Sequence, residues 1–173
     1  MIHLTPADYT TMPWANGKGS TVELRRVDRD GALLWRLSMA RVAEDGPFSI
    51  FPAVERNLTV ITGPGFRLQG EGIDINCPPL QPRAFPGDVA LMASGTAAGA
   101  SDDFNVMTAR HLPRPAVTVE RRAHLPAGGL LALFALAPAK FNGGAMGLHD
   151  LVLTETAAQI DAGPVIAVRL LGL

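Results

Sequence analysis

Apolar and polar residues along this chain alternate over short runs that glycine and proline separate. The sequence contains 18 glycines and 14 prolines, so few stretches are long enough for an amphipathic helix. Short runs of this kind, bounded by turn residues, are typical of β-strands. We predict an all-β fold with very little helix. The expected strands lie at residues 21–27, 33–40, 58–62, 66–68, 88–92, 104–110, 117–122, 130–136, 151–154 and 165–171.

Two short segments are predicted to be helical. Thr5 suits the N-cap position, Pro6 the first helical position and Asp8 the third, which indicates a single turn. A second short helix is expected at residues 154–160. The most apolar segment, residues 130–137, is far shorter than the ~20 residues of a membrane-spanning helix, so no membrane association is expected.

A boundary in the strand pattern is expected at residues 111–115, where the sequence reads His-Leu-Pro-Arg-Pro. Proline cannot donate a hydrogen bond to a sheet ladder. A chain of 173 residues is near the size of one domain and is also long enough for two small barrels. We therefore predict a larger barrel at residues 1–112 and a smaller one at residues 113–173.

Composition limits the classes of partner. The 15 Lys and Arg residues are balanced by 16 Asp and Glu, giving a formal net charge of −1, so no basic stripe for nucleic acid is expected. Cys77 is the single cysteine, which excludes an internal disulfide. The N-terminal residues lack the basic start and apolar run of a secretory signal, and we expect a cytoplasmic protein.

Residues 35–39 alternate strictly, so Arg36 and Ser38 share one strand face and apolar side chains occupy the other. In a β-sandwich the apolar face packs the core and Arg36 is solvated. In a small barrel around a ligand, the polar row lines the cavity instead. Glu23 and Arg25 form a similar row, which exposed cross-strand charges explain equally well.

Aromatic residues follow a turn at residues 45–52, and such a loop is able to cover the mouth of a barrel. Phe48 and Phe51 either face a ligand or plug the barrel end as core residues. Arg56 follows closely, and its guanidinium offers a planar fork for a carboxylate. Most arginines at strand ends are surface charges, so this pattern alone leaves both interpretations open.

Asp103, Asn105 and Met107 share one face of a predicted strand. If that face points inward, an acid and an amide lie in a cavity. Capping of a turn by Asp102 or Asp103 is the simpler explanation.

The segment from Trp14 to Thr21 contains a lysine between two glycines and resembles a phosphate-binding loop. A Walker-type loop requires Ser or Thr directly after the lysine, whereas Gly19 follows Lys18. The segment also leads into a strand, and phosphate loops open a helix. We therefore do not assign it to phosphate binding.

No metal site or nucleophile is predicted. The four histidines show no spacing that brings two ligands together, and no nucleophile elbow is present. Cys77 has no histidine nearby to activate it. We expect no cofactor and assign no catalytic residue.

Several motifs taken in order resemble the HutD/Ves family, over roughly residues 3–110. The sequence departs from the commoner family pattern at Ala15, a place often basic, and at Lys18, a place often glycine. The motifs are Pro13-Trp14, Asn16-Gly17, Gly19-Ser20-Thr21 with Glu23, Trp35-Arg36 with Ser38 and Ala40, residues 45–52, Arg56, Phe85-Pro86-Gly87-Asp88 and residues 103–107.

The resemblance implies a cupin-type double barrel, or bicupin, that forms a homodimer. It also implies a metal-free pocket for an intermediate of histidine degradation, such as urocanate or N-formylglutamate, and a role in restraining histidine utilisation. The expected function is thus binding of a small anionic metabolite rather than catalysis. The alternative is a cofactor-free isomerase or hydrolase that acts on a small carboxylate in the same pocket, with Glu23 or Asp103 as general base.

The resemblance favours the inward-facing interpretation of the polar rows. Arg36 and Arg56 are expected to bind a carboxylate, and Asn16 or Lys18 to face the ligand. The full set of predicted ligand-binding residues is Trp14, Asn16, Lys18, Glu23, Arg36, Ser38, Phe48, Phe51, Arg56, Asp103 and Asn105.

Overall fold

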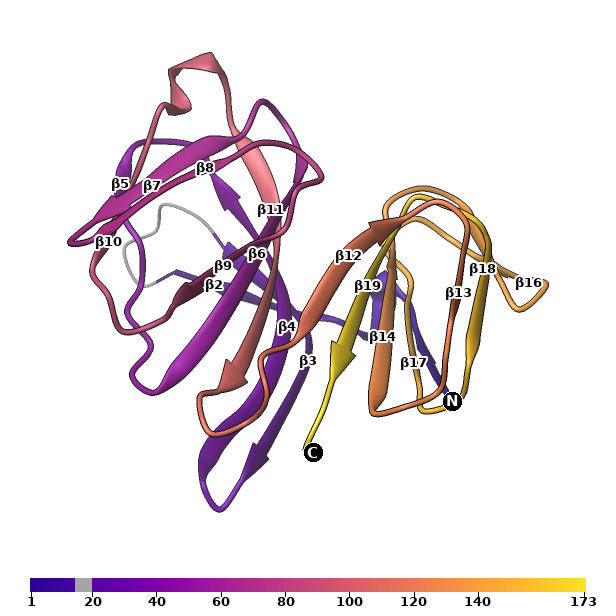
Figure 1. Ribbon diagram of the computed structural model, residues 1–173. Coiled ribbons are helices and arrows are strands. Elements are labelled where there is room, and N and C mark those ends of the chain that lie inside the picture. The colour runs from indigo at the N-terminus through magenta and orange to yellow at the C-terminus, as the bar shows by residue number, and fades with distance from the viewer. Residues whose placement is uncertain (15–19) are drawn as a thin grey trace. The chain divides into compact units, whose positions relative to one another are not determined.

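The computed structural model describes residues 1–14 and 20–173. Their contacts divide the chain into two compact units (Figure 1): Thr10–Arg110 forms one, and Met1–Tyr9 with His111–Leu173 forms the other. Helix within the described residues is limited to two 3-10 turns, η1 (Pro6–Asp8) and η2 (Thr96–Ala98). The all-β prediction is confirmed. Across those residues no helix has the length and apolar character needed to span a membrane.

The unit Thr10–Arg110 contains two antiparallel sheets. The first has the strand order β2-β3-β4-β11-β6-β9 and the second β5-β10-β7-β8. The strands of the first sheet are β2 (Thr10–Pro13), β3 (Ser20–Arg29), β4 (Ala32–Val42), β11 (Ser101–Ala109), β6 (Val54–Thr62) and β9 (Arg83–Pro86). Those of the second are β5 (Gly46–Pro47), β10 (Leu91–Ser94), β7 (Phe66–Gly70) and β8 (Ile73–Cys77).

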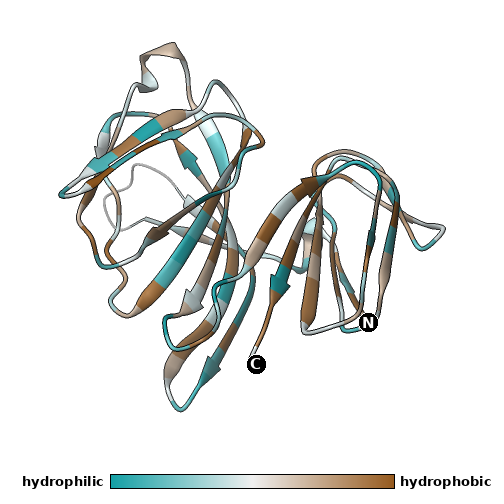
Figure 2. Ribbon diagram, in the orientation of Figure 1, coloured by the Kyte–Doolittle hydropathy of each residue, from teal (hydrophilic) through white to brown (hydrophobic). Residues whose placement is uncertain are grey.

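Apolar side chains from both sheets form the core of this unit. Polar and apolar bands alternate along its strands in Figure 2, as expected where successive side chains point to opposite faces. Leu58 and Leu68 are fully buried at the centre of the cluster. The other buried members are Val42, Val60, Phe66, Cys77, Phe85, Leu91 and Ala93.

The other unit also contains two antiparallel sheets, ordered β1-β17-β14-β19-β12 and β13-β18-β15-β16. Its interior is filled by an apolar cluster that includes Leu131, Leu133, Phe141 and Ile160. The strands of the first sheet are β1 (Ile2–Leu4), β17 (Leu151–Thr154), β14 (Leu130–Ala135), β19 (Val165–Leu170) and β12 (Ala116–Glu120). Those of the second are β13 (Ala123–Leu125), β18 (Ala158–Ala162), β15 (Ala139–Phe141) and β16 (Gly144–Met146).

The N-terminal segment belongs to this second unit, whereas our division at residue 112 placed it in the first. β1 pairs with β17, and His3 Nε2 lies 2.8 Å from Asp150 Oδ2. The Tyr9 hydroxyl donates to the carbonyl of His149 over 2.6 Å. These contacts join segments about 140–150 residues apart, a separation at which sequence patterning carries no information.

The predicted helix at residues 154–160 is wrong. β17 ends at Thr154, and β18 begins at Ala158. The Thr154 hydroxyl accepts a hydrogen bond from the backbone of Thr156 and stabilises the turn between them. Ala158 and Ile160 then alternate with exposed or half-buried polar residues, which is the two-residue period of a strand.

Gly87 follows β9 directly, and two backbone hydrogen bonds join it to the segment that leads into β6. Its amide donates to the Val54 carbonyl, and its carbonyl accepts from the Phe51 amide, both over 2.7 Å. A Cβ atom at this position would lie 2.8 Å from the carbonyl oxygens of Phe51 and Val54. The close approach explains why the turn after Phe85-Pro86 requires glycine.

We predict that Gly87→Ala lowers the free energy of unfolding by about 1–3 kcal/mol, because the added methyl group displaces backbone carbonyls. Gly46→Ala is the matched control, since a Cβ atom there has no neighbour within 4 Å. It should change stability by less than about 0.5 kcal/mol. Urea unfolding of both variants measures the difference, and equal stabilities would contradict this account of Gly87.

Candidate ligand-binding site

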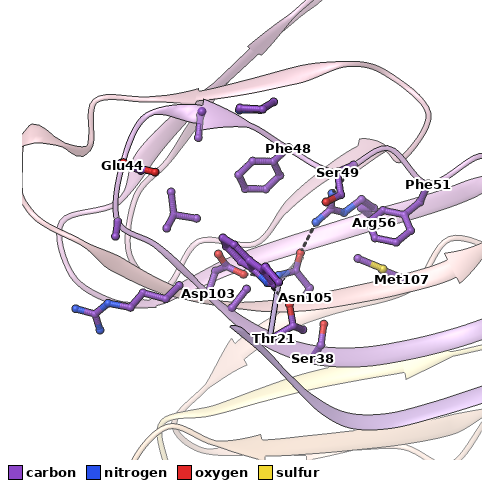
Figure 3. A pocket seen from close by; sticks show the side chains of 18 of the residues that line it. Thr21, Ser38, Glu44, Phe48, Ser49, Phe51, Arg56, Asp103, Asn105 and Met107 are labelled. Atoms are coloured by element: carbon purple, nitrogen blue, oxygen red, sulfur yellow. Dashed lines mark hydrogen bonds between the residues drawn. The ribbon is translucent and has the colours of Figure 1, made fainter. Parts of the chain in front are cut away.

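A cavity of about 680 Å³ lies inside the unit Thr10–Arg110. Its volume is within the range of roughly 300–1,000 Å³ found for small-molecule sites. Side chains of β4, β6 and β11 form one wall, and residues 43–51 form another (Figure 3). The lining residues are Trp14, Thr21, Arg36, Ser38, Ala40, Arg41, Val42, Ala43, Glu44, Asp45, Gly46, Pro47, Phe48, Ser49, Phe51, Arg56, Ala93, Asp103, Asn105 and Met107.

Strand register brings the polar residues of this wall together. Met107 of β11 pairs with Arg36 of β4 on one side and with Arg56 of β6 on the other. Asn105 pairs with Ser38 in the next inward-facing row. Directly paired residues project from the same face of a sheet, so all five side chains point toward the cavity.

The structure decides between the two interpretations of the alternating segment 35–39. Arg36 is 8% exposed and lines the cavity, while Trp35 on the opposite face is 4% exposed. β4 is therefore buried on both faces. A sandwich strand with a solvated Arg36 is excluded.

Glu23 supports the wall without lining the cavity. Arg36 Nε donates to Glu23 Oε2 over 2.7 Å, and the two side chains are 9% and 21% exposed. A β-bulge in β3 follows Glu23, so Glu23 pairs with Ser38 whereas Arg25 pairs with Leu37. The expected polar row of Glu23 and Arg25 is therefore wrong, because the bulge places them on opposite faces.

Arg56 is buried beneath three phenyl rings. Its guanidinium carbon lies 5.3 Å from the ring centres of Phe48 and Phe51 and 5.0 Å from that of Phe85, distances at which a cation is attracted to a ring face. Burial lowers its pKa to about 10, so the side chain remains a cation at neutral pH. Arg56 therefore places a fixed positive charge in the wall.

The hydrogen-bond partners of Arg56 are neutral. Nη2 donates to Asn105 Oδ1 over 2.9 Å, and Nη1 donates to the Ser49 carbonyl over 3.3 Å. Nε is buried with no partner. Among the described residues no carboxylate lies within 4.0 Å of this guanidinium.

Asn105 links Arg56 to Asp103. Its Nδ2 donates to Asp103 Oδ1, and Figure 3 shows the two side chains next to each other in the wall. Asp103 is fully buried, and its Oδ2 has no hydrogen-bond partner in the described part of the chain. Burial raises the pKa of the Asp103 carboxyl to about 7, against the opposing effects of Arg56 and of the Asn105 hydrogen bond.

Aromatic side chains cover the apolar part of the cavity. Phe48 and Phe51 are half-buried and line it together with Trp14. The Trp14 indole donates to the Thr21 hydroxyl over 2.9 Å, which fixes the orientation of the ring. Phe48 also packs on Phe66, with ring centres 5.8 Å apart. Thus Phe48 contacts the core and lines the cavity at once.

Eight of the predicted residues line the cavity, namely Trp14, Arg36, Ser38, Phe48, Phe51, Arg56, Asp103 and Asn105. Thr21, Ser49 and Met107 line the cavity but were not predicted to do so. The shared face of Met107 and Asn105 was a usable signal, whereas Ser49 contributes a carbonyl oxygen that has no sequence signal. Asn16 and Lys18 lie outside the described residues.

The donor set does not match a metal centre. No group of three His, Cys, Asp or Glu side chains that could hold a metal ion occurs within residues 1–14 and 20–173. Among the polar residues that line the cavity, the buried ones are Arg36, Ser38, Arg56, Asp103 and Asn105, whereas Arg41, Glu44 and Asp45 are exposed. The buried set suits an anion with additional hydrogen-bonding groups.

A family model for HutD matches residues 6–162. The chain belongs to the HutD family. This family is associated with histidine utilisation. An uncharacterised 21.2 kDa protein from the hutC 3′ region of Pseudomonas putida is 39% identical over 111 residues. That match covers 61% of this chain and 57% of the relative, so it extends over little more than half of the relative's length.

Two solved structures match the fold over nearly the whole chain. HutD from Pseudomonas fluorescens, determined in a formate condition, has a TM-score of 0.88 and 29% identity, covering 98% of this chain and 97% of its own. A conserved protein of unknown function from Pseudomonas aeruginosa has a TM-score of 0.86 and 32% identity, covering 99% and 98%. The predicted cupin-type double barrel is confirmed.

Asp103 makes stability depend on pH in a defined direction. Its pKa in the folded protein is raised to about 7 from a usual value of 3.8, so between these values the folded state binds more protons than the unfolded state. The protonated Asp103 carboxyl therefore adds to the stability of the folded protein. This contribution is fully present below the pKa of Asp103 in the unfolded chain and is lost as the pH rises through its pKa in the folded protein.

We therefore predict that the stability of the wild type, relative to Asp103→Asn, falls between pH 4 and pH 7. The change should be on the order of a few kcal/mol at most, since one pKa unit corresponds to about 1.4 kcal/mol. Urea unfolding of both proteins across this range measures it. A constant difference between them would show that Asp103 does not titrate in this way.

Proposed function

We propose that this protein binds a small anionic metabolite in the cavity of the unit Thr10–Arg110, without a metal ion, and thereby modulates histidine utilisation. The metabolite is an intermediate of histidine degradation, urocanate or N-formylglutamate. Both candidates are carboxylates small enough for a cavity of about 680 Å³.

The observation that carries the proposal is the environment of Arg56. Its guanidinium is buried, and among the described residues it contacts neutral acceptors only. A buried charge without a counter-ion is costly. Asp103 is linked to Arg56 only through the side chain of Asn105, which accepts from Arg56 and donates to Asp103. A carboxylate in the cavity would supply the missing negative charge and accept charge-assisted hydrogen bonds.

Arg36 supports the same interpretation. Glu23 occupies its Nε, and the two Nη groups have no hydrogen-bond partner within the described residues. The positive charge of Arg36 lowers the pKa of Arg56 further. The two arginines lie in one row of the sheet on either side of Met107 and both line the cavity, so a ligand in the cavity would face both guanidiniums. An anion between them would relieve their mutual repulsion.

The rest of the lining favours a ligand with a flat or apolar body. Phe48, Phe51 and Trp14 provide aromatic surface, and Met107 lies between the two arginines in the strand register. A short carboxylate with a planar or aliphatic body matches this division of the wall. Histidine degradation as its source is supported by the family and by the hutC region named for the P. putida relative.

We predict that Arg56→Gln weakens the binding of urocanate or N-formylglutamate by roughly 10- to 100-fold, because a charge-assisted hydrogen bond contributes about 1.5–3 kcal/mol. Isothermal titration calorimetry measures the affinity. Arg56→Lys should give an intermediate loss, since it keeps the charge but not the planar fork. Arg26→Gln is the control, because Arg26 is exposed and pairs with Asp28 outside the cavity.

Folding of each variant is checked by its thermal unfolding curve. The proposal is contradicted if the folded wild type gives no heat with either metabolite or with glutamate. It is also contradicted if Arg56→Gln and Arg26→Gln bind the metabolite with equal affinity.

Catalysis in the same cavity is a second candidate, favoured by Asp103. A buried carboxyl whose pKa is raised to about 7 is suited to act as a general base at neutral pH. Glu23 suits this role less, because it is paired with Arg36 and does not line the cavity. Incubation with both metabolites followed by mass analysis tests this candidate, and unchanged metabolites would count against it.

The proposal includes a homodimer, which the family resemblance implies, and a cytoplasmic location, which is a separate expectation. Multi-angle light scattering on the purified protein measures the mass against that of the 173-residue chain. A monomer at micromolar concentration would remove the dimer from the proposal and leave the ligand site unaffected.

A further inference from the structure

One carboxylate oxygen in the cavity wall has no partner. Asp103 is fully buried and lines the cavity. Its Oδ1 accepts from Asn105 Nδ2, while Oδ2 is buried and makes no hydrogen bond to any described residue. Buried polar atoms are nearly always paired in folded proteins. The unpaired Oδ2 is therefore available to form a hydrogen bond with a molecule bound in the cavity.

The orientation of Asn105 determines what Asp103 can offer. Asn105 Oδ1 accepts from Arg56, so Nδ2 is the end that faces Asp103. Asp103 Oδ1 is therefore used as an acceptor, and Oδ2 is the oxygen that remains. Above the raised pKa of about 7 the Asp103 carboxyl is ionised. An ionised Oδ2 can only accept a hydrogen bond, and the matching group on a ligand is an N–H donor.

Arg56 and Asp103 lie at the two ends of a hydrogen-bonded chain of three side chains, with Asn105 between them. The guanidinium has a buried Nε with no partner, and the carboxyl has a buried oxygen with no partner. One amide, Asn105, separates the two groups, and both residues line the cavity, so a single small molecule bound there would lie next to both. Its carboxylate would meet the guanidinium and its N–H would meet Asp103.

We propose that Asp103 determines specificity: it accepts a hydrogen bond from an N–H group of the bound molecule. The cavity therefore selects small carboxylates that also carry an N–H donor over isosteres that lack it. This inference rests on the anion site of the proposed function. It adds a second recognition point, which an anion site built on Arg36 and Arg56 alone does not have.

A matched pair of probes tests the inference. Pyrrole-3-carboxylate and 3-furoate have nearly the same shape, and they differ in that a ring N–H of the first is a ring oxygen in the second. Their carboxylate and ring heteroatom lie on opposite sides of the ring. A site that needs only an anion binds both equally, whereas a site with an unpaired acceptor rejects the one without the donor.

We expect the wild type to bind pyrrole-3-carboxylate roughly 10- to 100-fold more tightly than 3-furoate, because a hydrogen bond to a charged group contributes about 1.5–3 kcal/mol. NMR titration measures affinities into the millimolar range. In Asp103→Asn the new amide oxygen faces Asn105 Nδ2, and its NH₂ group takes the place of Oδ2. The preference should disappear, since an acceptor is replaced by a donor.

Asp102→Asn is the matched control. Asp102 is the preceding residue, does not line the cavity, and is paired with Arg41 and Thr62 instead. This variant should keep the full preference for pyrrole-3-carboxylate. Thermal unfolding shows that both variants are folded before binding is compared.

The outcomes separate this inference from the proposed function. If both probes bind the wild type equally and Arg56→Gln weakens both, the anion site stands and the role of Asp103 is overturned. A preference that survives in Asp103→Asn also overturns it. If neither probe binds the folded wild type at millimolar concentration, the anion site itself fails and the inference fails with it.

Discussion

The burial of a guanidinium inside a small barrel is the constraint on which the rest of this site depends. Arg56 projects inward from β6 and lies next to the apolar cluster that contains Leu58 and Phe85. Phenyl rings, an asparagine and a backbone carbonyl surround it. None of these groups carries a negative charge, so the direct contacts of the Arg56 guanidinium leave its charge uncompensated.

Asn105 and Asp103 are linked to this guanidinium by hydrogen bonds, and the register of β11 with β6 brings them next to it. The two residues alternate on β11, so both reach the interior, and β11 lies between the strands that carry Arg36 and Arg56. Leu58, which pairs with Asn105 on β6, already belongs to the apolar core. The polar groups thus occupy one part of the interior, and the apolar cluster closes the rest.

Alternation along the sequence predicts which side chains share a strand face where the alternating run is long enough. Alternation at residues 35–39 predicts that Arg36 and Ser38 share a face, and the structure places both in one wall. The separation of Glu23 from Arg25 was not predictable, because a bulge has no reliable signature in a single sequence. The strand at Ala158–Ala162 was mistaken for helix, since two apolar residues are too few to reveal a period. The link from Arg56 through Asn105 to Asp103 depends on pairing between β6 and β11, and pairing is a property of the whole fold.

The three phenyl rings around Arg56 also affect the thermodynamics of association. A free arginine side chain samples many rotamers, and immobilising such a side chain at an interface costs about 0.5–1.5 kcal/mol. Here that conformational freedom is lost when the barrel folds, before any ligand arrives. The guanidinium is preorganised, so an incoming anion meets a receptor that is already ordered at the point of contact.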